Sequence, residues 1–136
     1  MKKLLTLLLF FTSTIAFAGV SFVDSFDVSS QETNPNGLAF SADGTKMFVV
    51  GNMDLDVNEY TLTTGFDVSS ASFVDSFDVS SQDTAPISLT FNSDGTKMFV
   101  LGYAGIDVNE YTLTTGFDVS TASFTGDVFD ISSKES

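Results

Sequence analysis

Residues 37–62, GLAFSADGTKMFVVGNMDLDVNEYTL, decide the fold, because they return as residues 88–113, SLTFNSDGTKMFVLGYAGIDVNEYTL. Outward from this pair, residues 22–72 align without a gap onto residues 73–123 and are identical at 38 of 51 positions. A partial third repeat covers residues 124–136 and carries one inserted residue. Such a period indicates copies of one supersecondary unit that bury their apolar faces against each other.

Each unit carries the pattern of four β-strands. Consecutive apolar residues at 46–50 and 97–101 predict a strand that is buried on both faces. A shorter apolar run precedes each of them across an Asp-Gly pair, at 43–44 and 94–95, which is typical of a tight hairpin because glycine accepts positive φ. These first two strands are therefore expected to be the most buried.

The later strands of each unit mix β-forming residues with acids and amides. They are expected at 57–62 and 72–79, and at 108–113 in the second unit. Residues 21–28 repeat the sequence of 72–79, so one extra strand is predicted ahead of the first complete unit. The rising polarity predicts that the last strand of each unit meets solvent.

A resemblance to a known fold family rests on residues 34–51, NPNGLAFSADGTKMFVVG. This stretch resembles the blade sequence shared by YVTN-type, NHL-type and WD-type β-propellers, although the second copy has Ser88 where the first has Gly37 and no Trp-Asp pair is present. The resemblance implies an all-β fold of four-stranded antiparallel blades, with two blades plus one extra strand after an N-terminal signal helix. It implies no activity, because propellers host unrelated functions. A β-sandwich or an open meander is the alternative architecture.

The N-terminus has the features of a secretory signal peptide. Lys2 and Lys3 precede an apolar run, and Ala16-Phe17-Ala18 provides a cleavage site after residue 18. The run is shorter than the roughly 20 residues that span a bilayer. We therefore expect residues 1–18 to be removed and residues 19–136 to be exported to the periplasm, the cell surface or the medium, without insertion in the membrane.

The charge and the missing residue types exclude several functions. A net charge of −13 repels nucleic acid, so no nucleic-acid partner is predicted. The chain has no His and no Cys, which excludes a Ser-His-Asp triad, a thiol nucleophile and a His-ligated zinc ion. The sequence therefore predicts a protein that is not an enzyme, with a calcium-dependent propeller hydrolase as an alternative.

No cofactor is predicted, and calcium is the one ion that the acidic side chains leave open. Residues 54–59, DLDVNE, have the alternating acids of a calcium loop, but they lack its turn glycine and its distant bidentate Glu. Alternation along a strand explains the same pattern. Asp43 and Asp94 are likewise interpreted as turn residues.

A candidate binding face follows from the thirteen differences between the repeats. Four of them lie at 32–37 and four at 52–55, in two connections that an antiparallel blade places at the same end of its sheet. The connection at 63–70 barely changes, which argues against simple drift of loops. The predicted ligand-binding residues, for a glycan, a cation or a protein, are Asn34, Asn36, Asn52, Asp54, Tyr103 and Asp107.

Two blades do not close a ring, since propellers have at least four. Three interpretations follow: the chain is a piece of a longer propeller, it is a homo-oligomer whose copies complete a ring, or it is an open stack with exposed edges. The functional hypotheses are an extracytoplasmic binding module and, as the alternative, a structural part of a larger ring.

Overall fold

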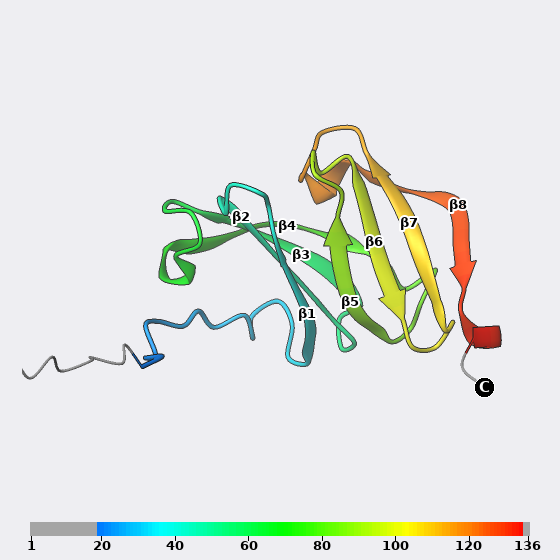
Figure 1. Ribbon diagram of the computed structural model, residues 1–136, viewed down its shortest axis with the longest axis horizontal. Helices are drawn as coiled ribbons and strands as arrows, with labels where there is room; N and C mark the ends of the chain where they lie inside the picture. The colour runs from blue at the N-terminus through cyan, green and yellow to red at the C-terminus, as the bar shows by residue number, and fades with distance from the viewer. Residues whose placement is uncertain (1–18, 135–136) are drawn as a thin grey trace, which may run out of the picture.

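Two four-stranded antiparallel sheets make up the protein (Figure 1), as a computed structural model of residues 19–134 shows. The first sheet contains β1 (Pro35–Phe40), β2 (Lys46–Gly51), β3 (Asp56–Leu62) and β4 (Ala71–Asp78). The second contains β5 (Pro86–Phe91), β6 (Lys97–Gly102), β7 (Asp107–Leu113) and β8 (Ala122–Asp130). Three 3-10 turns, η1 (Val68–Ser70), η2 (Val119–Thr121) and η3 (Ser132–Lys134), follow strands β3, β7 and β8.

The strands of each sheet are ordered as in the sequence, so each connection joins neighbouring strands. The predicted all-β fold of four-stranded antiparallel units is therefore confirmed. The predicted signal peptide and its helix lie outside the described residues.

The β1–β2 hairpin forms as its Asp-Gly pair predicts. Gly44 has a φ of 71°, a conformation that costs glycine little. Asp43 Oδ1 accepts hydrogen bonds from Ser41 Oγ at 2.7 Å and from the amide and hydroxyl of Thr45 at 3.0 and 2.8 Å. The hydrogen bond from the Thr45 amide and those from the two hydroxyls lower the pKa of Asp43 to about 2. Asp43 is thus a turn residue.

The inserted residue of the third repeat is absorbed in a bulge of β8. In the first sheet Tyr60 pairs with Phe73 and Glu59 with Asp75. In the second, Tyr111 pairs with Phe124 but Asn109 pairs with Val128, so the strand carries extra residues there. Gly126, with a φ of 89°, lies at the irregularity. The partial repeat therefore supplies the outer strand of the second sheet.

The expected extra strand at 21–28 is wrong, since the structure shows no strand there. The reason is pairing: β4 forms its ladder with β3, whereas no strand among residues 19–134 pairs with residues 21–28. The segment still takes the corresponding place, because Phe26 packs edge-on against Tyr60 at 5.5 Å between ring centroids, as Phe77 does against Tyr111 at 5.5 Å.

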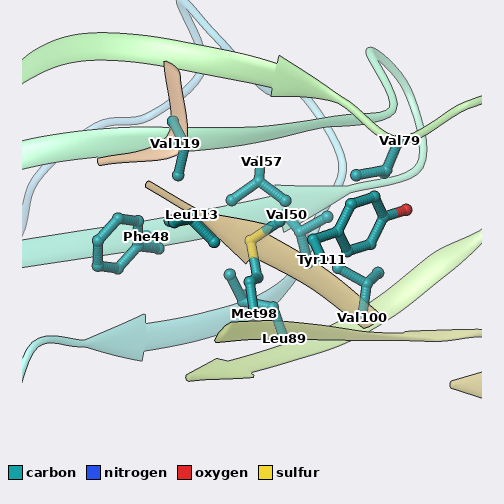
Figure 2. Close-up of a cluster of buried hydrophobic side chains, with 10 residues drawn as sticks. All are labelled: Phe48, Val50, Val57, Val79, Leu89, Met98, Val100, Tyr111, Leu113 and Val119. Carbon is teal, nitrogen blue, oxygen red and sulfur yellow. The ribbon is translucent and has the colours of Figure 1, made fainter. Parts of the chain in front are cut away.

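The main core lies between the two sheets (Figure 2). Its buried members are Phe48, Val50, Val57, Val79, Leu89, Met98, Val100, Tyr111, Leu113 and Val119. A smaller cluster, Met47, Val49, Tyr60 and Leu62, lies on the other side of the first sheet. The apolar area that these side chains remove from water provides the main stabilisation of the fold, since none is available from disulfides.

The distribution of burial along the first sheet differs from the expectation. Strands β2 and β3 are the most buried, whereas β1 is mostly exposed or half-buried. The prediction that the first two strands would be the most buried is therefore wrong for β1. The physical reason is that β1 packs against β5 on one side, while its other side faces no second sheet among the described residues.

Candidate functional site

The predicted binding residues lie at one end of the two sheets, where the β2–β3 and β6–β7 loops meet the segments that lead into β1 and β5. The Asn52 amide donates to the Asn34 carbonyl at 3.4 Å, and the Tyr103 amide donates to the Ala85 carbonyl at 3.0 Å. The two connections therefore lie together in each sheet. We call this region the loop end, defined as residues 32–37, 52–55, 83–88 and 103–106.

A buried carboxylate holds each half of the loop end in place. Glu32 is 1% exposed, and its carboxylate accepts hydrogen bonds from the Asn34 amide at 2.6 Å and the Asp54 amide at 3.3 Å. Asp83 is equally buried and accepts from the Ala85 and Gly105 amides, both at 2.6 Å. Both carboxylates bind backbone amides of the loop end. The difference between Glu32 and Asp83 is therefore a difference in how the two repeats hold their loops.

Glycine is required beside each of these carboxylates. A Cβ added at Gly51 would collide with the side chain of Glu32, and one at Gly102 would collide with Asp83. Both glycines end a strand at the loop end, and both repeats keep them. The close approach of strand to carboxylate therefore explains two residues that the repeat pattern left without a role.

The six predicted site residues divide into two groups. Asn34, Asn52 and Asp54 are exposed and gather around Glu32, and Tyr103 is 73% exposed in the corresponding loop of the second sheet. The other two have structural partners. Asn36 Nδ2 donates to the Pro86 carbonyl at 3.1 Å and so ties the sheets together, and Asp107 Oδ1 accepts from Asn109 Nδ2 at 2.8 Å. Ligand binding by the first group stays a prediction.

The loops that carry these side chains have a fixed backbone. Leu55 and Ile106 adopt positive φ values of 63° and 53°, which is unfavourable for a β-branched residue such as isoleucine. Each is held by its carbonyl, which accepts a hydrogen bond at 3.0 Å from Val79 and Ile131, respectively. The loops therefore present Met53 and Tyr103, which are 66% and 73% exposed, from an ordered frame.

The connection at 63–70, which differs from its counterpart 114–121 only at Ser70, has a structural role that the sequence alone did not reveal. Its counterpart in the second sheet forms part of the contact between sheets: Phe117 packs on Phe91 and Phe48, and the Val119 amide donates to Glu59 Oε2 at 2.9 Å. The second copy of this connection therefore has a packing role. The signal was present as apolar Phe and Val within an otherwise polar loop.

Charged groups also cross the contact between the sheets. Lys46 Nζ lies 2.6 Å from Glu59 Oε1 and donates to the Phe117 carbonyl at 2.7 Å. The Glu59 side chain is 2% exposed, so this pair is held largely away from water. The matching pair of the second sheet, Lys97 with Glu110 at 2.5 Å, is more exposed. The two pairs have the same residue types and differ in exposure, because the Lys46–Glu59 pair lies in the contact between the sheets.

Burial shifts the pKa of two ionisable groups in the first sheet. Burial is the main cause that raises the pKa of Tyr60 to about 12 and also raises the pKa of Asp56. Asn58 Nδ2 is the one buried side-chain donor that lacks a partner among residues 19–134. Within the same residues, no group of three or more acidic, His or Cys side chains is arranged to hold a metal ion.

An open apolar groove of about 410 Å³ lies on the outer side of the first sheet, away from the second. Its apolar lining includes Phe26, Val28, Leu38, Met47, Val49 and Val68. The sequence pattern does not reveal this groove, because the same residue types occur in the second repeat, where they are buried.

Comparison with known proteins adds no relationship. A scan against protein-family models found no match, and no curated protein matches the chain. In the part of the chain that the structure describes, no helix is long and apolar enough to cross a membrane.

Proposed function

We propose that the chain is an exported repeat module of the propeller type, and that it binds a glycan through its loop end rather than catalysing a reaction. The supporting observation is the distribution of differences between two otherwise nearly identical repeats. Eight of the thirteen differences lie at the loop end, whereas three lie in the opposite connections, one of which, 114–121, packs between the sheets. Surface residues that vary on a rigid scaffold are typical of binding sites.

The side chains at the loop end suit a sugar. The exposed ring of Tyr103 offers a flat apolar surface with a polar tip, and Asn34, Asn52 and Asp54 offer amide and carboxylate groups for hydroxyls. The frame is already ordered by Glu32 and Asp83, so little conformational entropy is lost on binding.

A glycan array tests this function. The chain from residue 19 onward is probed in the presence of calcium, beside a variant in which the first loop is made equal to the second, N52Y/M53A/D54G/L55I. The variant retains the amide at position 54 that Glu32 accepts from. The matched control is S41N/A42S, which makes the β1–β2 turn, at the opposite end of the sheet, identical in sequence to the β5–β6 turn.

We expect one class of glycan to bind the original chain and the control equally, and the loop variant to bind at least tenfold more weakly, the loss of one good contact. If no glycan binds, or if the loop variant binds as well as the original, the proposed function is wrong.

A second candidate function, that of a structural repeat in a larger ring, is favoured by one separate observation. The outer side of the first sheet and the outer side of the second both leave apolar side chains partly exposed.

A further inference from the structure

Two exposed faces of the molecule match the two halves of its own buried core. The leading face belongs to the first sheet and consists of Leu38, Met47, Val49, Phe66 and Val68. Leu38 and Phe66 are exposed, whereas Phe26 and Val28 of the N-terminal segment pack against the buried cluster that contains Met47 and Val49. The trailing face belongs to the second sheet and consists of Phe99, Leu101, Val108, Glu110 and Phe129. Each is the repeat-related copy of a face that is covered within the chain.

The leading faces of the two sheets have the same side chains but different surroundings. In the second sheet Leu89 is 5% exposed and Val119 is fully buried, because the first sheet covers them. In the first sheet Leu38 is 58% exposed and Val68 is only half-buried. The open groove of about 410 Å³ therefore lies where another trailing face would pack.

The trailing faces show the same contrast in reverse. Phe48, Val50 and Val57 of the first sheet are fully buried against the second. Their counterparts Phe99, Leu101 and Val108 are half-buried, and only the Val-to-Leu change alters a side chain. Phe99 and Val108 line a second groove, beside the exposed ring of Phe129.

The polar groups of the covered contact also have counterparts in the open faces. Within the chain, Glu59 accepts from the Val119 amide and Lys46 donates to the Phe117 carbonyl. The Lys97–Glu110 pair is already formed in the second sheet, ready to meet the Val68 amide and the Phe66 carbonyl of another leading face.

The aromatic side of the leading face is arranged in the same way in both sheets. Phe40 and Phe66 lie 5.6 Å apart, as Phe91 and Phe117 lie 5.4 Å apart where they receive Phe48. The open face therefore needs no rearrangement of these rings to accept Phe99.

We propose that the chain binds a second copy of itself head to tail, with the trailing face of one copy packed on the leading face of the next. Such a heterologous contact repeats until it closes. Propellers close with four to eight blades, so rings of two to four copies are expected. This inference is tested separately from glycan binding, since residues 52–55, which the loop variant changes, line neither groove.

The N-terminal segment has to move for this contact to form. Phe26 of one copy and Phe129 of the preceding copy would both occupy the place beside Tyr60 of the first, as Phe77 does beside Tyr111. β8 is held by its ladder with β7, whereas residues 21–28 form no strand. The N-terminal segment therefore yields, and in the free chain it partly covers the leading face.

Sedimentation velocity of the chain from residue 19 onward tests the proposal over a range of concentrations. L38E places a charge in the leading face, F129D places one in the trailing face, and M53E changes an equally exposed apolar residue outside both. Leu38, Phe129 and Met53 are 58%, 64% and 66% exposed, so the fold tolerates all three changes, which circular dichroism verifies.

The original chain and M53E are expected to sediment as one discrete species of two to four copies, and L38E and F129D to associate roughly tenfold more weakly or worse. An equimolar mixture of L38E and F129D retains one intact contact and should form a 1:1 dimer and nothing larger. A monomeric original chain, or a mixture that fails to pair, overturns the proposal and leaves a different partner for the groove.

Discussion

Leu38 and Leu89 occupy the same position in the two repeats, yet the first is 58% exposed and the second 5% exposed. The same holds for Phe66, which is 61% exposed, and Phe117, which packs among Phe48 and Phe91. Two nearly identical faces thus differ only in whether a neighbouring sheet covers them. The contribution of a side chain to stability is therefore set by the neighbour, and paired substitutions can measure it.

The largest difference is expected at the trailing faces. F48A removes a fully buried ring from the core and should lower the free energy of unfolding by about 3–5 kcal/mol. F99A removes its half-buried counterpart and should cost about 1–2 kcal/mol. Urea unfolding measures both, in the L38E background so that self-association does not contribute. Equal losses would show that the two faces are covered alike.

The charged pairs should differ in the same direction by a smaller amount. E59Q leaves Lys46 without its buried anion and weakens the bond from the Val119 amide, so a loss of about 2–3 kcal/mol is expected. E110Q acts on an exposed pair and should cost about 0–1 kcal/mol. The same urea titrations report both. A greater loss from E110Q than from E59Q would contradict the assignment of the covered face.

Deletion of residues 19–28 tests the competition for the place beside Tyr60. Because the shortened chain no longer covers its own leading face, we expect its dissociation constant for self-association to fall by roughly threefold to tenfold. Sedimentation equilibrium measures the constant. Weaker association would mean that the segment contributes to the contact rather than competing with it.

The smallest difference between repeats is expected at the hairpin turns, where Asp43 and Asp94 accept the same two hydrogen bonds from Thr45 and Thr96 and differ mainly in the extra bond that Ser41 donates to Asp43. Hydrogen bonds to neighbouring residues lower the pKa of both Asp43 and Asp94, to about 2 for Asp43. Because the folded pKa lies below the ordinary value of 3.8, the stabilisation is present above about pH 4 and is lost as pH falls toward 2. As the pH falls from about 4 to about 2, the melting temperature of D43A and of D94A should decrease less than that of the original chain, and by a similar amount in both variants. A change confined to one variant would show that the turns are not equivalent.

Most of the fold could be predicted from local patterns. The apolar run at 46–50 and the Asp-Gly pairs specify β2, β6 and their hairpins, since such signals need no knowledge of distant residues. The extra strand at 21–28 could not be judged in this way, because a strand exists only where a partner supplies hydrogen bonds. The exposure of β1 likewise depends on a missing neighbour.

The candidate site was predicted in part. The repeat differences placed Asn34, Asn52 and Asp54 together, but they also pointed to Asn36 and Asp107, whose side chains have structural partners. They did not reveal that Glu32 and Asp83 are buried, since that burial depends on the close approach of Gly51 and Gly102. The role of the nearly unchanged connection at 63–70 could be seen only from the contact between the sheets.

Cross-linking tests most directly whether the open faces pair as the covered faces do. Ala42 lies across a groove from Gly116, next to Thr115, so A42C/T115C calibrates the reach of a short bismaleimide within one chain. Between copies the corresponding positions are Ser93 and Thr64, and no native cysteine competes. A mixture of S93C and T64C chains should give cross-linked dimers, whereas neither variant alone should give them. Adding L38E to the T64C chain should abolish these dimers. If the A42C/T115C chain cross-links internally but the mixture of S93C and T64C chains gives no dimers, head-to-tail pairing is contradicted.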